Sequence, residues 1–160
     1  KYAKVTPLRD ETGLVVDYIT EGDFPTYGND DDRADEIAAA IVHTVMSKIK
    51  EIPLYRDAMP TQSVLTITSN VVYGKATGSF PSGHKAGTPF APGANPENGV
   101  DNHGMLASML SVGKLDYSDA LDGISLTNTI TPSGLGRTKE EQVNNLVGIL
   151  DAGFVPEDCC

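Results

Sequence analysis

A glycine- and proline-rich run from Gly74 to Gly104 constrains the fold more than any other stretch of this sequence. It holds a large share of the chain's 16 Gly and 10 Pro residues, and it has few large apolar side chains. Proline lacks a backbone donor and glycine loses the most entropy on ordering, so the run cannot pack as a regular helix or strand. It is also too long for an ordinary connection, which predicts a functional loop or a loop pinned by the rest of a larger protein.

The segments before this loop predict a strand pair and a long helix. Residues 1–28 alternate loosely between apolar and polar side chains, which favours a short strand pair or a β-rich surface segment. Residues 31–50 repeat apolar side chains at helical spacing, with aspartates at the start, lysines at the end and Pro53 as a stop. The buried face of this helix is expected to consist of Ala34, Ile37, Ala38, Ile41, Val42, Val45, Met46 and Ile49.

Three shorter segments add to a mixed α/β pattern. Residues 59–75 fit either a buried strand or a short helix running into one, because β-branched residues are mixed with Leu and Thr. Residues 105–115 predict a short helix. Residues 123–132 alternate apolar and polar side chains and predict a strand that Pro132 ends.

The last regular element expected is a helix over residues 139–153. Thr138 and Glu141 have the spacing of a capping box, in which each side chain bonds the other's backbone N–H. Gly153 is expected to end the helix. The side chains expected to face inward are Val143, Leu146, Val147 and Leu150.

The composition describes an acidic globular chain of about one domain. Its 160 residues include 12 basic and 22 acidic side chains, a net charge of −10, and such a surface repels nucleic acid. No run of about 18 apolar residues occurs, so no membrane partner is expected, and the first residues have no apolar core of a signal peptide. The only cysteines, Cys159 and Cys160, make neither a disulfide framework nor a zinc site, which predicts a reducing cytoplasm.

Local motifs alone do not define a catalytic or binding site. The stretch GSFPSGHK has the glycine spacing of a phosphate-binding loop, but His84 stands where lysine belongs. Three prolines follow it and prevent the helix whose N-terminus would hold the phosphates. Asp101 and His103 share the loop with His84 and could form a site with it. Three polar residues in one loop often meet by chance, so no catalytic, cofactor or metal site is assigned.

A longer pattern across this loop is informative. It consists of FPSGHKAGTP at residues 80–89, GANP at 93–96, Gly99, Asp101, Gly104 and SVGK at 111–114. This pattern resembles the common loop of the glycyl radical enzymes, T-P-D-G-R-x-A-G-x-P followed by G-A-N-P, G, D, G and S-V-x-K. The flanking stretches KYAKVTPLRDETGL, YRDAMPTQSVLTITSNVVYGK and DGISLTNTITPSGLG are similar to the late part of the pyruvate formate-lyases in particular. Two residues depart from the family pattern, because Ser82 and His84 replace its usual Asp and Arg.

The resemblance covers the chain from Lys1 to about Gly153 and implies its fold class. We expect an α/β fold that is a partial segment of a ten-stranded α/β barrel, with helices, a few strands and a long ordered loop at about 74–104. Residues 1–160 are expected to form a single fragment of the barrel domain. The glycyl radical domain is expected to be absent, because no R-V-S-G-Y-type motif occurs and the ending FVPEDCC departs from the family.

The resemblance also implies a function. Pyruvate formate-lyase, or formate C-acetyltransferase, converts pyruvate and coenzyme A into formate and acetyl-CoA by a radical mechanism, and this segment is expected to be mainly scaffold and inactive alone. The family's adjacent cysteine pair lies in mid-chain, whereas Cys159 and Cys160 follow an acidic stretch, so no catalytic residue is expected here. No bound cofactor is expected; the parent enzyme carries a glycyl radical and uses coenzyme A.

The implied partners are the rest of the parent chain, a second subunit in a homodimer, and a radical-SAM activating enzyme. Two other interpretations stay open. One is a fragment of another glycyl radical lyase, which shares the loop but not the flanking stretches. The other is a truncated, non-catalytic interaction or binding module.

Overall fold

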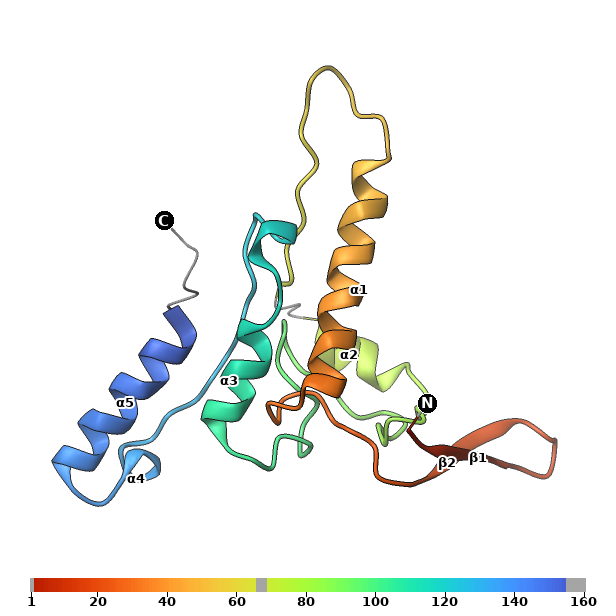
Figure 1. Cartoon of the computed structure of the whole chain (residues 1–160). Helices are drawn as coiled ribbons and strands as arrows, with labels where there is room; N and C mark the ends of the chain where they lie inside the picture. The colour runs from red at the N-terminus through yellow and green to blue at the C-terminus, as the bar shows by residue number, and fades with distance from the viewer. Residues whose placement is uncertain (1, 66–68, 155–160) are drawn as a thin grey trace.

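The computed structural model describes residues 2–65 and 69–154 of the chain. Three arms extend from a common centre: a β-hairpin, the long helix α1 and the C-terminal helix α5 (Figure 1). The centre holds helix α3 and the glycine- and proline-rich loop (Figure 1). The expected α/β class is confirmed as a partial segment made of helices, two strands and a long loop.

The first arm is an antiparallel hairpin of β1 (Lys4–Arg9) and β2 (Val15–Glu21). Its turn is fixed by Asp10, whose carboxylate accepts hydrogen bonds from the backbone N–H groups of Thr12 and Leu14 at 2.9 and 3.0 Å. The strand pair predicted in residues 1–28 is therefore confirmed. Every residue of β1 is exposed, whereas β2 is half-buried at Asp17, Tyr18 and Thr20.

The second arm is α1 (Asp32–Lys50), which confirms the predicted helix. Asp31 caps it by accepting a hydrogen bond from the N–H of Arg33 at 3.0 Å, and the helix ends before Pro53. The predicted buried face is only half correct. Met46 is buried and Val42 is half-buried, whereas another part of the same face is exposed, consisting of Ile37, Ile41 and Val45.

Of the strand and the short helix considered for the segment between α1 and the loop, the described residues contain only the helix, and a single bridge stands in place of the strand. Val64 forms an isolated parallel bridge with Ile124, and α2 (Asn70–Lys75) follows. Part of that predicted segment, residues 66–68, lies outside the described residues.

The core lies where α3 (Met105–Gly113) and the turn after it meet α1. The predicted helix of residues 105–115 is thus confirmed. A short 3-10 helix, η1 (Tyr117–Asp119), follows and also contacts α1. The buried apolar side chains of the described residues are Met46, Ala94, Met109, Val112, Leu115 and Ala120.

The strand predicted over residues 123–132 is wrong, because the segment has two unlike neighbours. On one side Ser125 donates to the carbonyl of Val64 at 2.7 Å, and on the other its carbonyl accepts from Ala94 at 2.8 Å. Neither neighbour continues as a strand, so these bonds form no ladder among the described residues. Pro132 begins a helical turn, α4 (Pro132–Leu135), rather than ending a strand, as suits proline at the first helical position.

The third arm is α5 (Lys139–Phe154), whose predicted capping box is confirmed. The N–H of Glu141 donates to Thr138 Oγ1 at 3.2 Å, and Glu141 Oε2 accepts from the N–H of Thr138 at 3.0 Å. Two details of the prediction are wrong. The helix continues through Gly153, which lies against the end of the Met109 side chain in α3. The four residues expected to face inward are exposed, namely Val143, Leu146, Val147 and Leu150.

Among the helices that the structure describes, none has the length and apolar character needed to cross a membrane.

Candidate functional site

The loop from Ala76 to Gly104 contains turns but no helix or strand, as expected, and neighbouring elements hold it in place. Its first attachment is to α2. Asn70 Nδ2 donates to the carbonyl of Phe90 at 2.8 Å. The buried Gly74 lies so close to the loop that a Cβ there would be 2.1 Å from the carbonyl oxygen of Thr88. Glycine is required at this position because the neighbour is backbone, which cannot move aside like a flexible side chain.

The second attachment is to the hairpin. Lys85 Nζ binds a carboxylate oxygen of Asp17 at 2.7 Å, and Thr20 Oγ1 donates to the carbonyl of Pro81 at 2.6 Å. The hydrogen bond from Lys85 is the main cause that lowers the pKa of Asp17. The start of the loop is therefore tied to residues more than sixty positions earlier in the chain.

The third attachment is to the residues that precede α1. The Asn29 side chain donates to the carbonyl of Val100 at 2.6 Å and accepts from the backbone N–H of His103 at 3.0 Å. His103 Nδ1 lies 3.0 Å from the Asn29 carbonyl oxygen. Gly28, with φ +98°, packs against Pro96 at a distance that excludes any Cβ.

The fourth attachment joins the middle of the loop to the extended segment after η1. Asn95 forms a two-way pair with the backbone of Thr127, donating at 2.8 Å and accepting at 2.9 Å. An amide side chain with both groups bonded to one residue has a fixed orientation. The GANP motif is thus held at its asparagine.

His84 is the centre of the first half of the loop. Its ring contacts those of Phe80 and Phe90 at centroid distances of 5.2 and 4.9 Å, and the two phenyl rings contact each other at 6.1 Å, so the three rings form one cluster. His84 is 3% exposed. His84 Nδ1 lies 2.5 Å from Glu97 Oε1. A phosphate would meet a carboxylate here instead of a helix N-terminus, since no helix follows until Met105. The rejection of a phosphate-binding loop is therefore supported by the geometry.

The three polar residues weighed as a possible site do not come together. His84 bonds Glu97, and His103 bonds Asn29. Asp101 is exposed and makes no hydrogen bond or ion pair with any described residue. The absence of a catalytic, cofactor or metal site at these three residues stays a prediction.

An ion-pair cluster that the sequence analysis missed joins α3 to the start of α1. Lys114 Nζ lies 2.6, 2.7 and 2.8 Å from carboxylate oxygens of Asp30, Asp32 and Asp35. Ser111 Oγ accepts from the N–H of Asp30 at 2.9 Å and donates to Asp35 at 3.1 Å. The aspartates before α1 had been interpreted as a cap and a solvated face, but only Asp31 caps the helix. The available signal was the SVGK motif, whose Ser and Lys make these contacts.

The electrostatics of this cluster are unusual because Asp35 is 1% exposed. Burial pulls the pKa of Lys114 down, but the hydrogen bonds to its three aspartates raise it well above its ordinary value. Two buried polar atoms of the described part have no partner, Asp35 Oδ1 and the Tyr27 hydroxyl. Burial and the nearby Asp35 charge raise the pKa of Tyr27 far above its usual range. Lys114 is therefore the principal counter-charge of a buried carboxylate.

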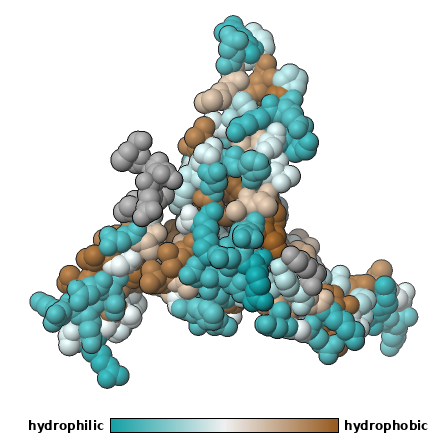
Figure 2. All heavy atoms as spheres, viewed as in Figure 1, coloured by the Kyte–Doolittle hydropathy of each residue, from teal (hydrophilic) through white to brown (hydrophobic). Residues whose placement is uncertain are grey.

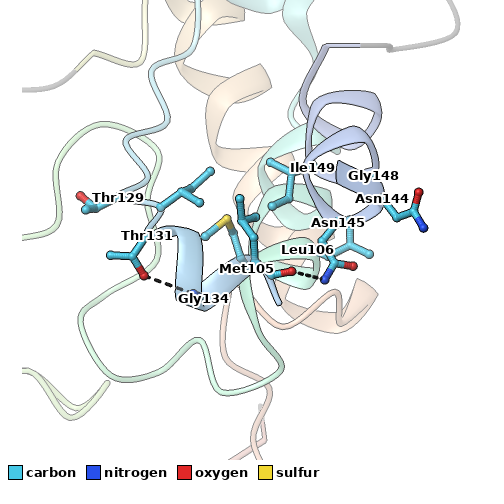
Figure 3. A pocket seen from close by; sticks show the side chains of 11 residues that line it. Met105, Leu106, Thr129, Thr131, Gly134, Asn144, Asn145, Gly148 and Ile149 are labelled. Atoms are coloured by element: carbon cyan, nitrogen blue, oxygen red, sulfur yellow. Dashed lines mark hydrogen bonds between the residues drawn. The ribbon is translucent and has the colours of Figure 1, made fainter. Parts of the chain in front are cut away.

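Two of the pockets beside α3 are lined by its first residues. The first, of about 300 Å³, lies between the start of α3, α4 and α5 and is mostly apolar, with Met105, Leu106 and Ile149 pointing into it (Figure 3). The Asn145 amide at its edge donates to the Leu135 carbonyl at 2.6 Å (Figure 3). The second, of about 400 Å³, lies between the GANP part of the loop, the first turn of α3 and residues 127–129, and is polar.

The candidate pair Cys159 and Cys160 lies outside the described residues. Within residues 2–65 and 69–154, no group of three or more His, Cys, Asp or Glu side chains is arranged to hold a metal ion. His43 in α1 bonds the buried carboxylate of Asp119 at 2.7 Å.

The chain is similar to two families of known sequence. Residues 1–74 match the family described as pyruvate formate lyase-like, and residues 90–160 match the family described as glycine radical. The second match covers a region where the sequence analysis expected no glycyl radical domain. The R-V-S-G-Y-type motif does not occur in the 160 residues. Two expectations therefore stay predictions: that the radical-bearing part is absent, and that residues 1–160 form a single unit.

Curated relatives match nearly the whole chain. It is 56% identical over 154 residues to the PFL-like enzyme TdcE of Escherichia coli and 54% identical over 154 residues to formate acetyltransferase 1 of the same organism. It is 50% identical to formate acetyltransferase of Haemophilus influenzae. These alignments cover 96% of this chain but only 20 or 21% of the relatives, so the chain spans about a fifth of their length.

Solved structures agree with the sequence matches. A glycyl radical enzyme from Archaeoglobus fulgidus superimposes with a TM-score of 0.71 at 30% identity over 82% of this chain and 17% of that one. The B12-independent glycerol dehydratase of Clostridium butyricum gives 0.69 at 28% identity, over 81% of this chain and 17% of its own. The expected placement in the late part of a pyruvate formate-lyase-like chain is thus confirmed, and the protein belongs to the glycyl radical enzymes.

Proposed function

We propose that this chain is the framework segment of a formate acetyltransferase, an enzyme that converts pyruvate and coenzyme A into formate and acetyl-CoA. The observation that carries the proposal is the 54% identity to formate acetyltransferase 1 over 154 residues. The identity to the glycerol dehydratase structure is 28%, which favours formate chemistry over that of another glycyl radical lyase.

A framework role is supported by the way the segment packs. Among the described residues, 26 large hydrophobic side chains are exposed, whereas the buried apolar core contains six. Apolar atoms lie at the surface along the arms of the molecule (Figure 2). Isolated soluble proteins rarely expose apolar area on this scale, so these faces suit contact with further protein. The partner that we propose is the remaining four fifths of the parent chain.

The loop is the part of this framework best suited to surround a reactive centre. Four attachments hold it, to α2, the hairpin, the residues before α1 and the segment after η1. A carbon radical needs protection from solvent, and a loop pinned at many points opens rarely. We propose that the catalytic residues, the glycyl radical and the coenzyme A site belong to other parts of the parent. The predicted cytoplasmic location, homodimer and radical-SAM activating partner complete this proposal.

A segment exchange tests the proposal. The matching 154 residues of E. coli formate acetyltransferase 1 are replaced by those of this chain, and formate release from pyruvate and coenzyme A is measured after anaerobic activation. A framework segment should preserve at least a tenth of the parent rate, because none of its residues touches substrate. The matched control inserts the corresponding segment of the glycerol dehydratase, whose lower identity should disrupt packing.

The isolated 160-residue chain, treated in the same way, should release no formate. Two results would contradict the proposal: formate release by the isolated chain, or a folded exchange protein that takes up the glycyl radical and still makes no formate. Electron paramagnetic resonance measures the radical independently of turnover.

A further inference from the structure

The polar pocket beside α3 is a feature that the proposed framework role does not require. It has a volume of about 400 Å³, within the range of small-molecule sites in proteins. Its walls are Asn95 and Asn98 of the loop, the α3 residue Ser108, and Asn128 and Thr129 of the extended segment, and Asp101 lies at its edge. No Lys, Arg or His lines it.

The pocket contains hydrogen-bonding groups without partners. Ser108 is 3% exposed, yet its hydroxyl makes no hydrogen bond with any described residue. The side chains of Asn98, Asn128 and Thr129 are likewise unbonded within the described part, and so is the Asp101 carboxylate. Of these residues only Ser108 is buried and the others are exposed, so the pocket presents polar groups that no described side chain occupies and that a ligand can bond.

The walls of the pocket are fixed before any ligand arrives. Asn95 is held by its two-way pair with Thr127. Val100, next to Asp101, is held by Asn29. A preformed site loses little conformational entropy on binding, which favours affinity for a small ligand.

The charge and the kind of lining groups select the ligand. One carboxylate with no cation near it makes the site negative, and its hydroxyl and amide oxygens accept hydrogen bonds. No group of three or more His, Cys, Asp or Glu side chains in the described part is arranged to hold a metal ion, so a metal has no adequate set of ligands here. A guanidinium or ammonium group supplies a positive charge together with three to five N–H donors, which matches these acceptors.

We propose that this pocket is a binding site for a small organic cation of the guanidinium or ammonium class. The cation has two possible sources, a Lys or Arg side chain from the rest of the parent chain or a free solute. Asp101 neutralises it, and Ser108 and the asparagine amides orient it. The proposal does not depend on the reaction that the parent enzyme performs.

The test uses the full parent polypeptide that contains residues 1–160. Methylguanidinium and methylammonium are titrated calorimetrically at low salt into the unsubstituted protein and into three variants. Asp101→Asn removes the charge without changing shape, and Ser108→Ala removes the Ser108 hydroxyl. Asp57→Asn is the matched control, because Asp57 is also exposed and unbonded among the described residues but lies outside the pocket. Thermal unfolding of all four proteins is recorded at low and high salt.

A free solute as the source predicts saturable binding of one cation per chain, about tenfold weaker in Asp101→Asn and unchanged in Asp57→Asn. A protein side chain as the source predicts no binding of added cation. In that case Asp101→Asn unfolds at a lower temperature than Asp57→Asn, and added salt reduces the difference between their two unfolding temperatures. The proposal is overturned by binding that Asp101→Asn leaves unchanged. It is equally overturned if no cation binds and the two Asn variants unfold alike.

Discussion

Replacement of Lys114 by methionine should destabilise the junction of α1 and α3 by about 3 kcal/mol. Methionine keeps most of the apolar stem and removes the charge, so Asp35 would remain buried with Ser111 as its one described partner. Removing one member of a buried ion pair typically costs about 3–5 kcal/mol. The lower end applies because Lys114 is 34% exposed, so water can reach the vacated position. The pairs with Asp30 and Asp32 add little, since those carboxylates are exposed.

The measurement is amide hydrogen exchange of the full parent polypeptide. About 3 kcal/mol corresponds to local opening that is roughly a hundredfold more frequent, seen in the amides of α1 and α3. Lys48→Met is the matched control, because Lys48 lies in α1 but pairs with the exposed Glu51 and should change exchange by less than about threefold.

The pH dependence gives a second check on Lys114. Folding raises its pKa, so the stabilisation is complete below its unfolded pKa of about 10.4 and is lost as the pH rises through the folded value. The effect of Lys114→Met should therefore be constant between about pH 6 and pH 9 and shrink only above about pH 10.5. The reasoning is refuted if the Lys114 and Lys48 variants exchange at the same rate in α1 and α3.

Three further predictions concern the loop and the core. Gly74→Ala should destabilise the loop by about 1–3 kcal/mol, because its Cβ would overlap the carbonyl of Thr88. Gly148→Ala has open space around it and should stabilise α5 by about 0.5–1 kcal/mol. Thermal unfolding of the two variants compares these effects. His84→Ala should remove two ring contacts and the hydrogen bond to Glu97. The backbone amides of residues 80–90 should therefore exchange hydrogen at least tenfold faster. Unchanged hydrogen exchange would contradict the stacked arrangement. Tyr27→Phe should be neutral or stabilising by up to about 1 kcal/mol, since the buried hydroxyl has no described partner. In the unsubstituted protein, an ultraviolet titration should show one tyrosine with a raised pKa, and Tyr27→Phe should remove that signal.

Local signals predicted the elements that local contacts create. The capping box of Thr138 and Glu141 and the aspartate cap of α1, both predicted, join residues within three positions of each other. The hairpin turn held by Asp10 was not predicted but is equally local. Such contacts do not depend on the rest of the fold, so they are readable in the sequence. The long loop was also predictable, because glycine and proline oppose regular structure wherever they occur.

The errors arose where the structure depends on distant partners. Periodicity identified an apolar face on α1 and another on α5, but it cannot state which element covers a face, and much of both is exposed here. The strand expected at residues 123–132 needed a neighbouring strand on one side, and the described residues supply only two backbone hydrogen bonds with Val64 and one with Ala94. The Lys114 cluster was missed because its members lie 79 and 82 residues apart.

That separation has a consequence for the order in which the protein is made. Asp35 leaves the ribosome long before Lys114, and at about 5–20 residues per second the 79 intervening residues take roughly 4–16 s to synthesise. Throughout that interval α1 carries a carboxylate whose counter-charge does not yet exist, so burying this end of the helix is unfavourable. Completion of the junction is therefore timed by the emergence of α3, and the nascent N-terminal part must stay soluble until then.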